Sequence, residues 1–157
     1  MTWTEPSALE RQAILRQART IAIVGASDNP SRASYFVSTY LQAETSYDLW
    51  FVNPRLTELL GQKVYPSLAD LPGEPDVVDV FRKASDLPQV ADEAIAADAK
   101  VLWLQLGLFD QDVADRATDA GLQVVMNRCL KVEHARFHGG LHLAGFDTGV
   151  IDSRRRR

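Results

Sequence analysis

The sequence lacks several features on which whole classes of protein depend. One cysteine among 157 residues, Cys129, excludes an internal disulfide framework and is typical of a reducing compartment. No apolar run approaches the ~18–20 residues that a membrane-spanning helix needs. The first residues have neither the basic nor the apolar region of a signal peptide. We therefore expect a cytoplasmic protein with no membrane partner.

The sequence also lacks an excess of positive charge, with 17 Lys and Arg residues against 21 Asp and Glu. The formal net charge is −4, and this value already includes the four arginines at positions 154–157, so the rest of the chain is more acidic still. A domain that binds nucleic acid presents a basic face. The composition therefore argues against nucleic acid as a partner, and we interpret residues 139–157 as a solvated C-terminal tail.

The chain does contain short apolar runs that alternate with amphipathic segments. Runs typical of buried strands cover residues 21–24, 49–52, 77–81, 101–106 and 122–126, and residues 63–66 form a further short extended piece. Residues 7 to about 19 have capping-box spacing at Ser7 and Glu10. Further helices are expected near Ser31, after Ser85 or Asp86, and after Asp110.

Strands that alternate with helices in this way predict a parallel sheet covered on both faces. We expect an α/β fold: a doubly wound, Rossmann-like parallel sheet of about five strands in a single domain. Residues 1–19 form an N-terminal helix packed on this domain, which occupies residues 20–138. Ligands of such sheets bind outside the carboxyl ends of the strands.

The first of these strand ends has the features of an anion site. The apolar run at 21–24 stops at Gly25, and a helix opens close to Ser31. Free N–H groups and the positive end of the helix dipole therefore point into the turn. Ser27, Ser31 and Arg32 add side-chain donors, so we interpret the turn as a phosphate cradle.

The turn lacks the glycines of a dinucleotide fingerprint. Ser27 and Pro30 occupy the second and third glycine positions of Gly-x-Gly-x-x-Gly. The second strand ends in Asn53-Pro54-Arg55, with no carboxylate for ribose hydroxyls. An arginine there favours a phosphorylated ribose, so the residues leave two ligands open, NADP and coenzyme A (CoA).

The blocks at the predicted strand ends resemble those of the small stand-alone CoA-binding proteins, which are similar to the CoA-binding domain of the succinyl-CoA synthetase α subunit. The resemblance covers roughly residues 7–138. Its blocks are Val-Gly-Ala-Ser-Asp-Asn-Pro-Ser-Arg at 24–32, Val-Asn-Pro-Arg at 52–55, Tyr-Pro-Ser-Leu at 65–68, Val-Asp-Val-Phe-Arg at 78–82, Trp-Leu-Gln-Leu-Gly at 103–107 and Asn-Arg-Cys-Leu-Lys-Val-Glu-His at 127–134. Asn127 stands where the family is expected to have aspartate.

The resemblance implies that this protein binds CoA or an acyl-CoA. It implies that the pyrophosphate lies on residues 25–27 and the following helix, that Arg55 lies near the 3′-phosphate, and that residues 80–82 border the adenine. The residues expected to contact the cofactor are Gly25, Ala26, Ser27, Ser31, Arg32, Asn53, Pro54, Arg55, Val80, Phe81, Arg82, Lys83, Gln105 and Gly107.

No nucleophile is paired with an evident base at the strand ends, so we expect binding without catalysis. Cys129, His134, His138 and His142 are candidate metal ligands by residue type. Glycines at 139–140 interrupt any helix that would align the histidines, so surface histidines are the simpler interpretation. The Cys129 thiol is either buried and inert or forms a mixed disulfide with CoA.

Two other functions stay open from the residues alone. One is a small NADP-dependent oxidoreductase, and the other is a regulatory or interaction protein with a vestigial nucleotide site. A homodimer formed through an exposed sheet edge or the N-terminal helix is compatible with all three.

Overall fold

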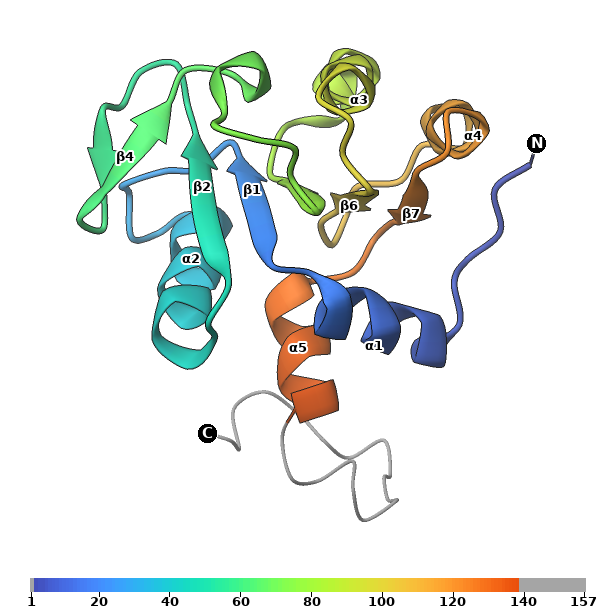
Figure 1. Ribbon diagram of the computed structural model, residues 1–157, viewed down its shortest axis with the longest axis horizontal. Helices are drawn as coiled ribbons and strands as arrows, with labels where there is room; N and C mark the ends of the chain where they lie inside the picture. The colour runs from blue at the N-terminus through green and yellow to red at the C-terminus, as the bar shows by residue number, and fades with distance from the viewer. Residues whose placement is uncertain (1, 139–157) are drawn as a thin grey trace.

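The computed structural model describes residues 2–138 of the chain. The predicted C-terminal tail, with His142 and the terminal arginines, lies outside the described residues. The strands form a seven-stranded sheet in the order β3-β4-β2-β1-β5-β6-β7 (Figure 1). They are β1 (Thr20–Val24), β2 (Asp48–Val52), β3 (Glu58–Leu59), β4 (Gln62–Tyr65), β5 (Val77–Val80), β6 (Val101–Leu104) and β7 (Gln123–Val125).

The sheet confirms the predicted α/β class and corrects the predicted strand number. All pairings are parallel except that of β3 with β4, which is antiparallel. The extended piece predicted at 63–66 corresponds to β4, whereas β3 and the turn of the hairpin were not predicted. Its turn places Leu60 at φ 51° and Gly61 at φ 79°, and leucine at a left-handed position hides the Asn-Gly or Asp-Gly signal by which such hairpins are recognised.

Five α-helices cover the sheet within the described part of the chain. They are α1 (Ala8–Gln17), α2 (Ala33–Glu44), α3 (Leu87–Ala96), α4 (Gln111–Asp119) and α5 (Leu130–His138). The capping box of Ser7 and Glu10 and the cap at Asp110 are both present as predicted. No helix within residues 2–138 has the length and apolar character that crossing a bilayer requires.

The start of α3 differs from the prediction. A 3₁₀ turn (Ala84–Asp86) leads into the helix, and Asp86 occupies the N-cap position without a side-chain cap bond. Its carboxylate instead accepts two hydrogen bonds from the Arg82 guanidinium, at 2.8 and 3.1 Å. The helix α5 was not predicted at all, because its apolar residues form no regular stripe.

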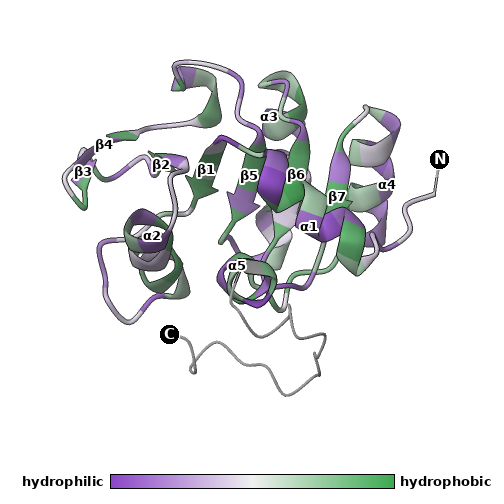
Figure 2. Cartoon of the chain, turned by 60° about the horizontal axis from the view of Figure 1, so that its bottom comes forward, coloured by the Kyte–Doolittle hydropathy of each residue, from purple (hydrophilic) through white to green (hydrophobic). Residues whose placement is uncertain are grey.

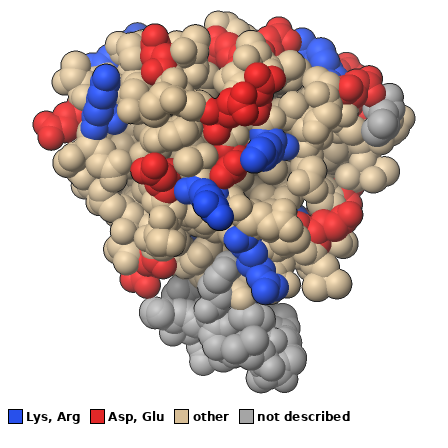
Figure 3. All heavy atoms as spheres, in the orientation of Figure 1, with Lys and Arg blue, Asp and Glu red and all other residues tan. Residues whose placement is uncertain are grey.

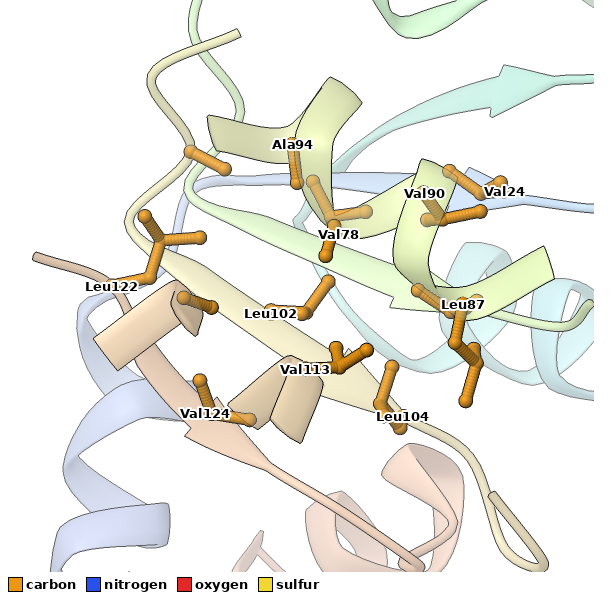
Figure 4. Close-up of a cluster of buried hydrophobic side chains, with 14 of the residues drawn as sticks. Val24, Val78, Leu87, Val90, Ala94, Leu102, Leu104, Val113, Leu122 and Val124 are labelled. Carbon is orange, nitrogen blue, oxygen red and sulfur yellow. The ribbon is translucent and has the colours of Figure 1, made fainter. Parts of the chain in front are cut away.

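The helices cover the sheet in two layers (Figure 1). On one face α3 and α4 bury the strand residues Val78 and Leu102 against Val90 and Val113 (Figure 4). On the other face α1, α2 and α5 cover a second cluster centred on the fully buried Trp103. Figure 2 shows the central strands as mainly hydrophobic while the helices carry both kinds of residue, as a sheet buried on both faces requires.

The strand order reverses between β1 and β5, and the two strands stay tightly packed where they end. The Phe81 N–H donates a 2.8 Å hydrogen bond to the Val24 carbonyl. Gly25 follows with φ +88°, and a Cβ atom placed on it would lie 2.3 Å from the Phe81 carbonyl oxygen. A side chain at position 25 would therefore force the ends of the two strands apart.

We expect Gly25→Ala to lower the free energy of unfolding by roughly 3 kcal/mol or more, since it combines left-handed strain with a backbone clash. Gly61→Ala is the matched control: its φ is +79°, but no atom lies within 4 Å of the added Cβ. It should cost only about 1–2 kcal/mol. Urea unfolding of both variants measures the two losses in the free energy of unfolding. Equal losses would contradict the close approach of Gly25 to the Phe81 carbonyl.

Candidate functional site

A cleft of about 820 Å³ lies at the carboxyl ends of the central strands, where the strand order reverses. This is the position at which open parallel sheets bind ligands. Most of the residues predicted to contact a cofactor line it. They are Gly25, Ala26, Ser27, Arg32, Asn53, Arg55, Phe81, Arg82, Lys83 and Gln105.

A second hollow of about 470 Å³ adjoins this cleft on the α3 side. The two share Gly25, Asn53, Arg55 and Arg82 along their common border. Pro54, another predicted site residue, lines the second hollow only. Arg55 therefore borders both spaces, at the end of β2.

Three predicted site residues line neither hollow. The Ser31 hydroxyl donates to the Asn29 side-chain oxygen at 2.8 Å, so this donor is used within the loop. Val80 has no exposed surface and packs into the core between the sheet and α3. The Gly107 N–H donates a 2.7 Å hydrogen bond to Asn127 Oδ1.

Asn127 itself adopts φ 60°, a left-handed conformation that asparagine and aspartate accept more readily than other residues with a side chain. Its side-chain oxygen is the acceptor for Gly107, and an aspartate would supply the same oxygen. The contact that the structure shows for Asn127 therefore does not depend on a charge.

Asn53 holds the loops of the site together. Its Nδ2 donates a 2.6 Å hydrogen bond to the Ala26 carbonyl, and its Oδ1 accepts one of 2.7 Å from the Arg55 N–H. Both ends of the amide are thus engaged by the loops after β1 and β2. Asn53 fixes the position of Arg55 relative to the turn after β1.

The cleft is positively charged. Arg32, Arg55 and Lys83 form no ion pair with any residue in the range 2–138, whereas Arg82 pairs with Asp86 at 2.8 Å. Elsewhere acidic and basic side chains are interspersed over the face that Figure 3 shows. Unpaired arginines and a lysine around one cleft favour an anionic ligand.

The N-terminus of α2 opens into the same cleft. Arg32 is its N-cap residue and makes no side-chain cap bond. The N–H groups of Ala33 and Ser34, which both line the cleft, donate to no other residue of the described chain. An uncapped helix start presents free donors and a positive dipole end, as the sequence predicted.

One side of the cleft is apolar, which the sequence reading missed. Phe36 from α2 and Leu106 and Leu108 after β6 line it. Phe36 is 61% exposed and Leu106 is 70% exposed. Apolar residues just beyond a predicted strand end, as at 106–109, are the signal that could have identified this part of the cleft.

Beneath the apolar side lies a buried carboxyl group that was also missed. Asp79 of β5 is fully buried and accepts a 2.6 Å hydrogen bond on Oδ1 from Gln105 Nε2. Its Oδ2 has no hydrogen-bond partner among the described residues. Burial raises the pKa of Asp79 to about 8, and the bond from Gln105 opposes this rise. An acidic residue inside an apolar strand was the signal in the sequence.

Cys129 lines the cleft just before α5. Burial raises the pKa of its thiol, the backbone N–H of Val132 acts in the opposite direction, and the charge of Asp79 raises it further. The thiol is therefore protonated at neutral pH, the less reactive form towards disulfides. Within residues 2–138 no three His, Cys, Asp or Glu side chains are grouped so that they could hold a metal ion.

The family follows from comparison with known proteins. The model of the CoA binding domain family matches residues 19–135. The protein belongs to this family of CoA binding domains, as the resemblance in the sequence indicated.

Two individual proteins are similar to this chain over most of its length. The chain is 41% identical over 130 residues to the uncharacterized protein YneT of Bacillus subtilis, covering 83% of this chain and 96% of YneT. A hypothetical protein from Pyrococcus horikoshii has a similar structure, with a TM-score of 0.81 and 38% identity over 88% of this chain and 100% of its own.

A larger enzyme contains a similar domain. The dinucleotide forming acetyl-coenzyme A synthetase 1 of Ca. Korarchaeum cryptofilum has a TM-score of 0.64 and is 27% identical. The match covers 69% of this chain and 26% of that enzyme. The fold therefore occurs both in small proteins and as part of a longer chain.

Asp79 predicts how stability depends on pH. Its folded pKa of about 8 lies above the ordinary 3.8, so between these values the folded protein holds a proton that the unfolded chain releases. The free energy of unfolding should fall as pH rises through this window, with a slope of up to about 1.4 kcal/mol per pH unit from this group.

The Asp79→Asn variant lacks this titration. Urea unfolding at pH 5 and pH 8 should show a smaller loss of stability for the variant than for the wild type. Asp92→Asn, at an exposed ion pair with Arg116, is the control and should keep the wild-type difference. Identical pH dependence in wild type and Asp79→Asn would contradict the raised pKa.

Proposed function

We propose that this protein binds CoA or an acyl-CoA in the cleft at the carboxyl ends of β1, β2, β5 and β6. One observation carries the proposal: the cleft offers two separate anion-binding features, the uncapped start of α2 and the unpaired Arg55 beyond β2. CoA has two anionic groups to match, a pyrophosphate and a 3′-phosphate on the ribose. Membership of the CoA binding domain family supports the same ligand.

The pyrophosphate would lie between the turn after β1 and the start of α2. Gly25 lets the backbone pass close to β5 without a side chain in the way. The N–H groups of Ala33 and Ser34 are free to donate there, and Arg32 stands beside them without an ion pair in the described chain. These donors suit a diphosphate group.

Arg55 would bind the 3′-phosphate. Asn53 fixes its backbone through the 2.7 Å bond to the Arg55 N–H, while the guanidinium has no acidic partner within residues 2–138. A guanidinium can donate two parallel hydrogen bonds to a phosphate. Lys83 lines the same cleft and adds a further positive charge.

The adenine would lie against Phe81 and Arg82, which line the cleft after β5. Phe81 offers a flat apolar surface, and a guanidinium can stack on an aromatic ring. Val80 takes no part in this contact through its side chain, because that side chain is in the core. The adenine surface is therefore limited to the two residues beyond the strand.

The cleft suits binding better than catalysis. Its lining contains no aspartate, glutamate or histidine among the described residues, and its one thiol has a raised pKa. A general base is thus missing from the places where a bound thioester could be reached. We propose a binding module without chemistry of its own.

Calorimetry of the wild-type protein tests this function. CoA should bind more tightly than dephospho-CoA, which lacks the 3′-phosphate, and more tightly than NADP. Preference for NADP would instead favour an oxidoreductase. If none of the three ligands binds, a regulatory protein with a vestigial site is favoured.

Arg55→Ala should weaken CoA binding by about 10- to 100-fold, the range expected when charged hydrogen bonds to phosphate are lost. The affinity of the variant for dephospho-CoA should fall less than threefold, since this ligand lacks the group that Arg55 is proposed to bind. The control is Arg16→Ala, which removes an exposed arginine from α1, away from the cleft. Equal losses for CoA and dephospho-CoA in Arg55→Ala would show that Arg55 does not meet the 3′-phosphate.

A further inference from the structure

The buried carboxyl of Asp79 is hydrogen-bonded to a polar side chain that lines the cleft. Asp79 lies on β5 in register with Ile23 of β1 and Trp103 of β6, so it sits in the middle of the sheet. It has no exposed surface. Its hydrogen-bond partner among the described residues is Gln105, which follows β6 and is 6% exposed on the cleft.

This bond decides which end of the Gln105 amide a ligand meets. Nε2 donates to Asp79 Oδ1 at 2.6 Å, so the nitrogen points down into the sheet. Nε2 and Oε1 diverge from the same carbon, and no residue in the described chain donates to Oε1. The oxygen is thus the end of the amide left for the cleft, where it can accept a hydrogen bond.

The acceptor lies far from the arginine proposed to bind the 3′-phosphate. In the sheet β2, β1, β5 and β6 are successive neighbours, so the ends of β2 and β6 are separated by three strand spacings, or roughly 14 Å. Arg55 follows the first of these strands and Gln105 the last. Leu106 and Leu108 follow Gln105 closely in the chain and line the cleft, and Phe36 of α2 lines the same cleft.

The chemistry of this end fits the arm of CoA. The arm leaves the pyrophosphate away from the ribose, is built mostly of methylene and methyl groups, and contains two amide N–H donors. Apolar walls with one fixed acceptor match such a segment, because an amide N–H that leaves water needs an acceptor.

We propose that Gln105 Oε1 accepts a hydrogen bond from an amide N–H of the pantetheine arm, and that Asp79 is the positioning residue that turns this oxygen to the cleft. The inference rests on the proposed function and adds to it the side of the cleft that receives the arm. Asp79 acts only through Gln105 and does not touch the ligand.

Two variants and two ligands test the proposal by calorimetry. Gln105→Met keeps the length of the side chain without its polar ends, and Asp79→Leu keeps a similar volume but frees the Gln105 amide to turn. CoA carries the arm, whereas adenosine 3′,5′-bisphosphate carries the adenine and the 3′-phosphate without it. Thermal unfolding confirms that each variant is folded.

Each variant should bind CoA about tenfold more weakly, the effect of one lost hydrogen bond, and bind the bisphosphate within twofold of wild type. The affinity of the double variant for CoA should fall about tenfold rather than a hundredfold, because both changes remove the same contact. A purely structural role of Asp79 would weaken both ligands together.

Three results would overturn the inference while leaving the proposed function intact: unchanged CoA affinity in Gln105→Met, equal losses for both ligands, or multiplied losses in the double variant. If Asp79→Leu does not fold, Gln105→Met alone tests the proposal: a loss of affinity for CoA but not for the bisphosphate supports it, and no loss for CoA contradicts it. Failure of the wild-type protein to bind CoA would instead refute the proposed function itself.

Discussion

The close approach of β1 and β5 at Gly25 is the constraint on which the site depends. The Phe81 carbonyl occupies the space that any side chain at position 25 would need. Because the two strand ends meet there, the turn after β1 and the residues after β5 border one cleft. The reversal of strand order leaves this edge open to solvent, and the uncapped start of α2 supplies its donors.

A buried ion pair joins α1 to α5, the helix that follows Cys129. Glu133 of α5 is 2% exposed and accepts a 2.6 Å hydrogen bond from Arg11 of α1, while Arg136 donates to it at 3.0 Å. Buried charges of this kind need their partners to remain satisfied. The N-terminal helix thereby fixes α5, and α5 places Cys129 and the loop before it at the cleft.

The sequence predicted the parts of the fold that have a regular apolar pattern. The buried strands around Gly25 and the caps at Ser7 and Asp110 follow from short-range chemistry. The turn of the β3–β4 hairpin could not be predicted in this way, because leucine at position 60 is not a typical turn residue although it adopts a left-handed conformation there. The cationic residues of the site were also predictable, since they follow strand ends. Ser31 lies outside the cleft lining, with its hydroxyl bonded to Asn29, so its predicted contact with a cofactor stays a prediction. Asp79 was missed because only the folded sheet joins it to Gln105.

The proposed function requires one CoA molecule to contact both the start of α2 and Arg55. An NMR titration of the ¹⁵N-labelled wild-type protein with CoA tests this most directly, because it reports on each backbone N–H separately. CoA should cause large shifts of the amides of Ser27, Ala33 and Ser34 together with that of Arg55, all saturating at the same CoA concentration. Shifts confined to other residues, or none at this edge of the sheet, would contradict it.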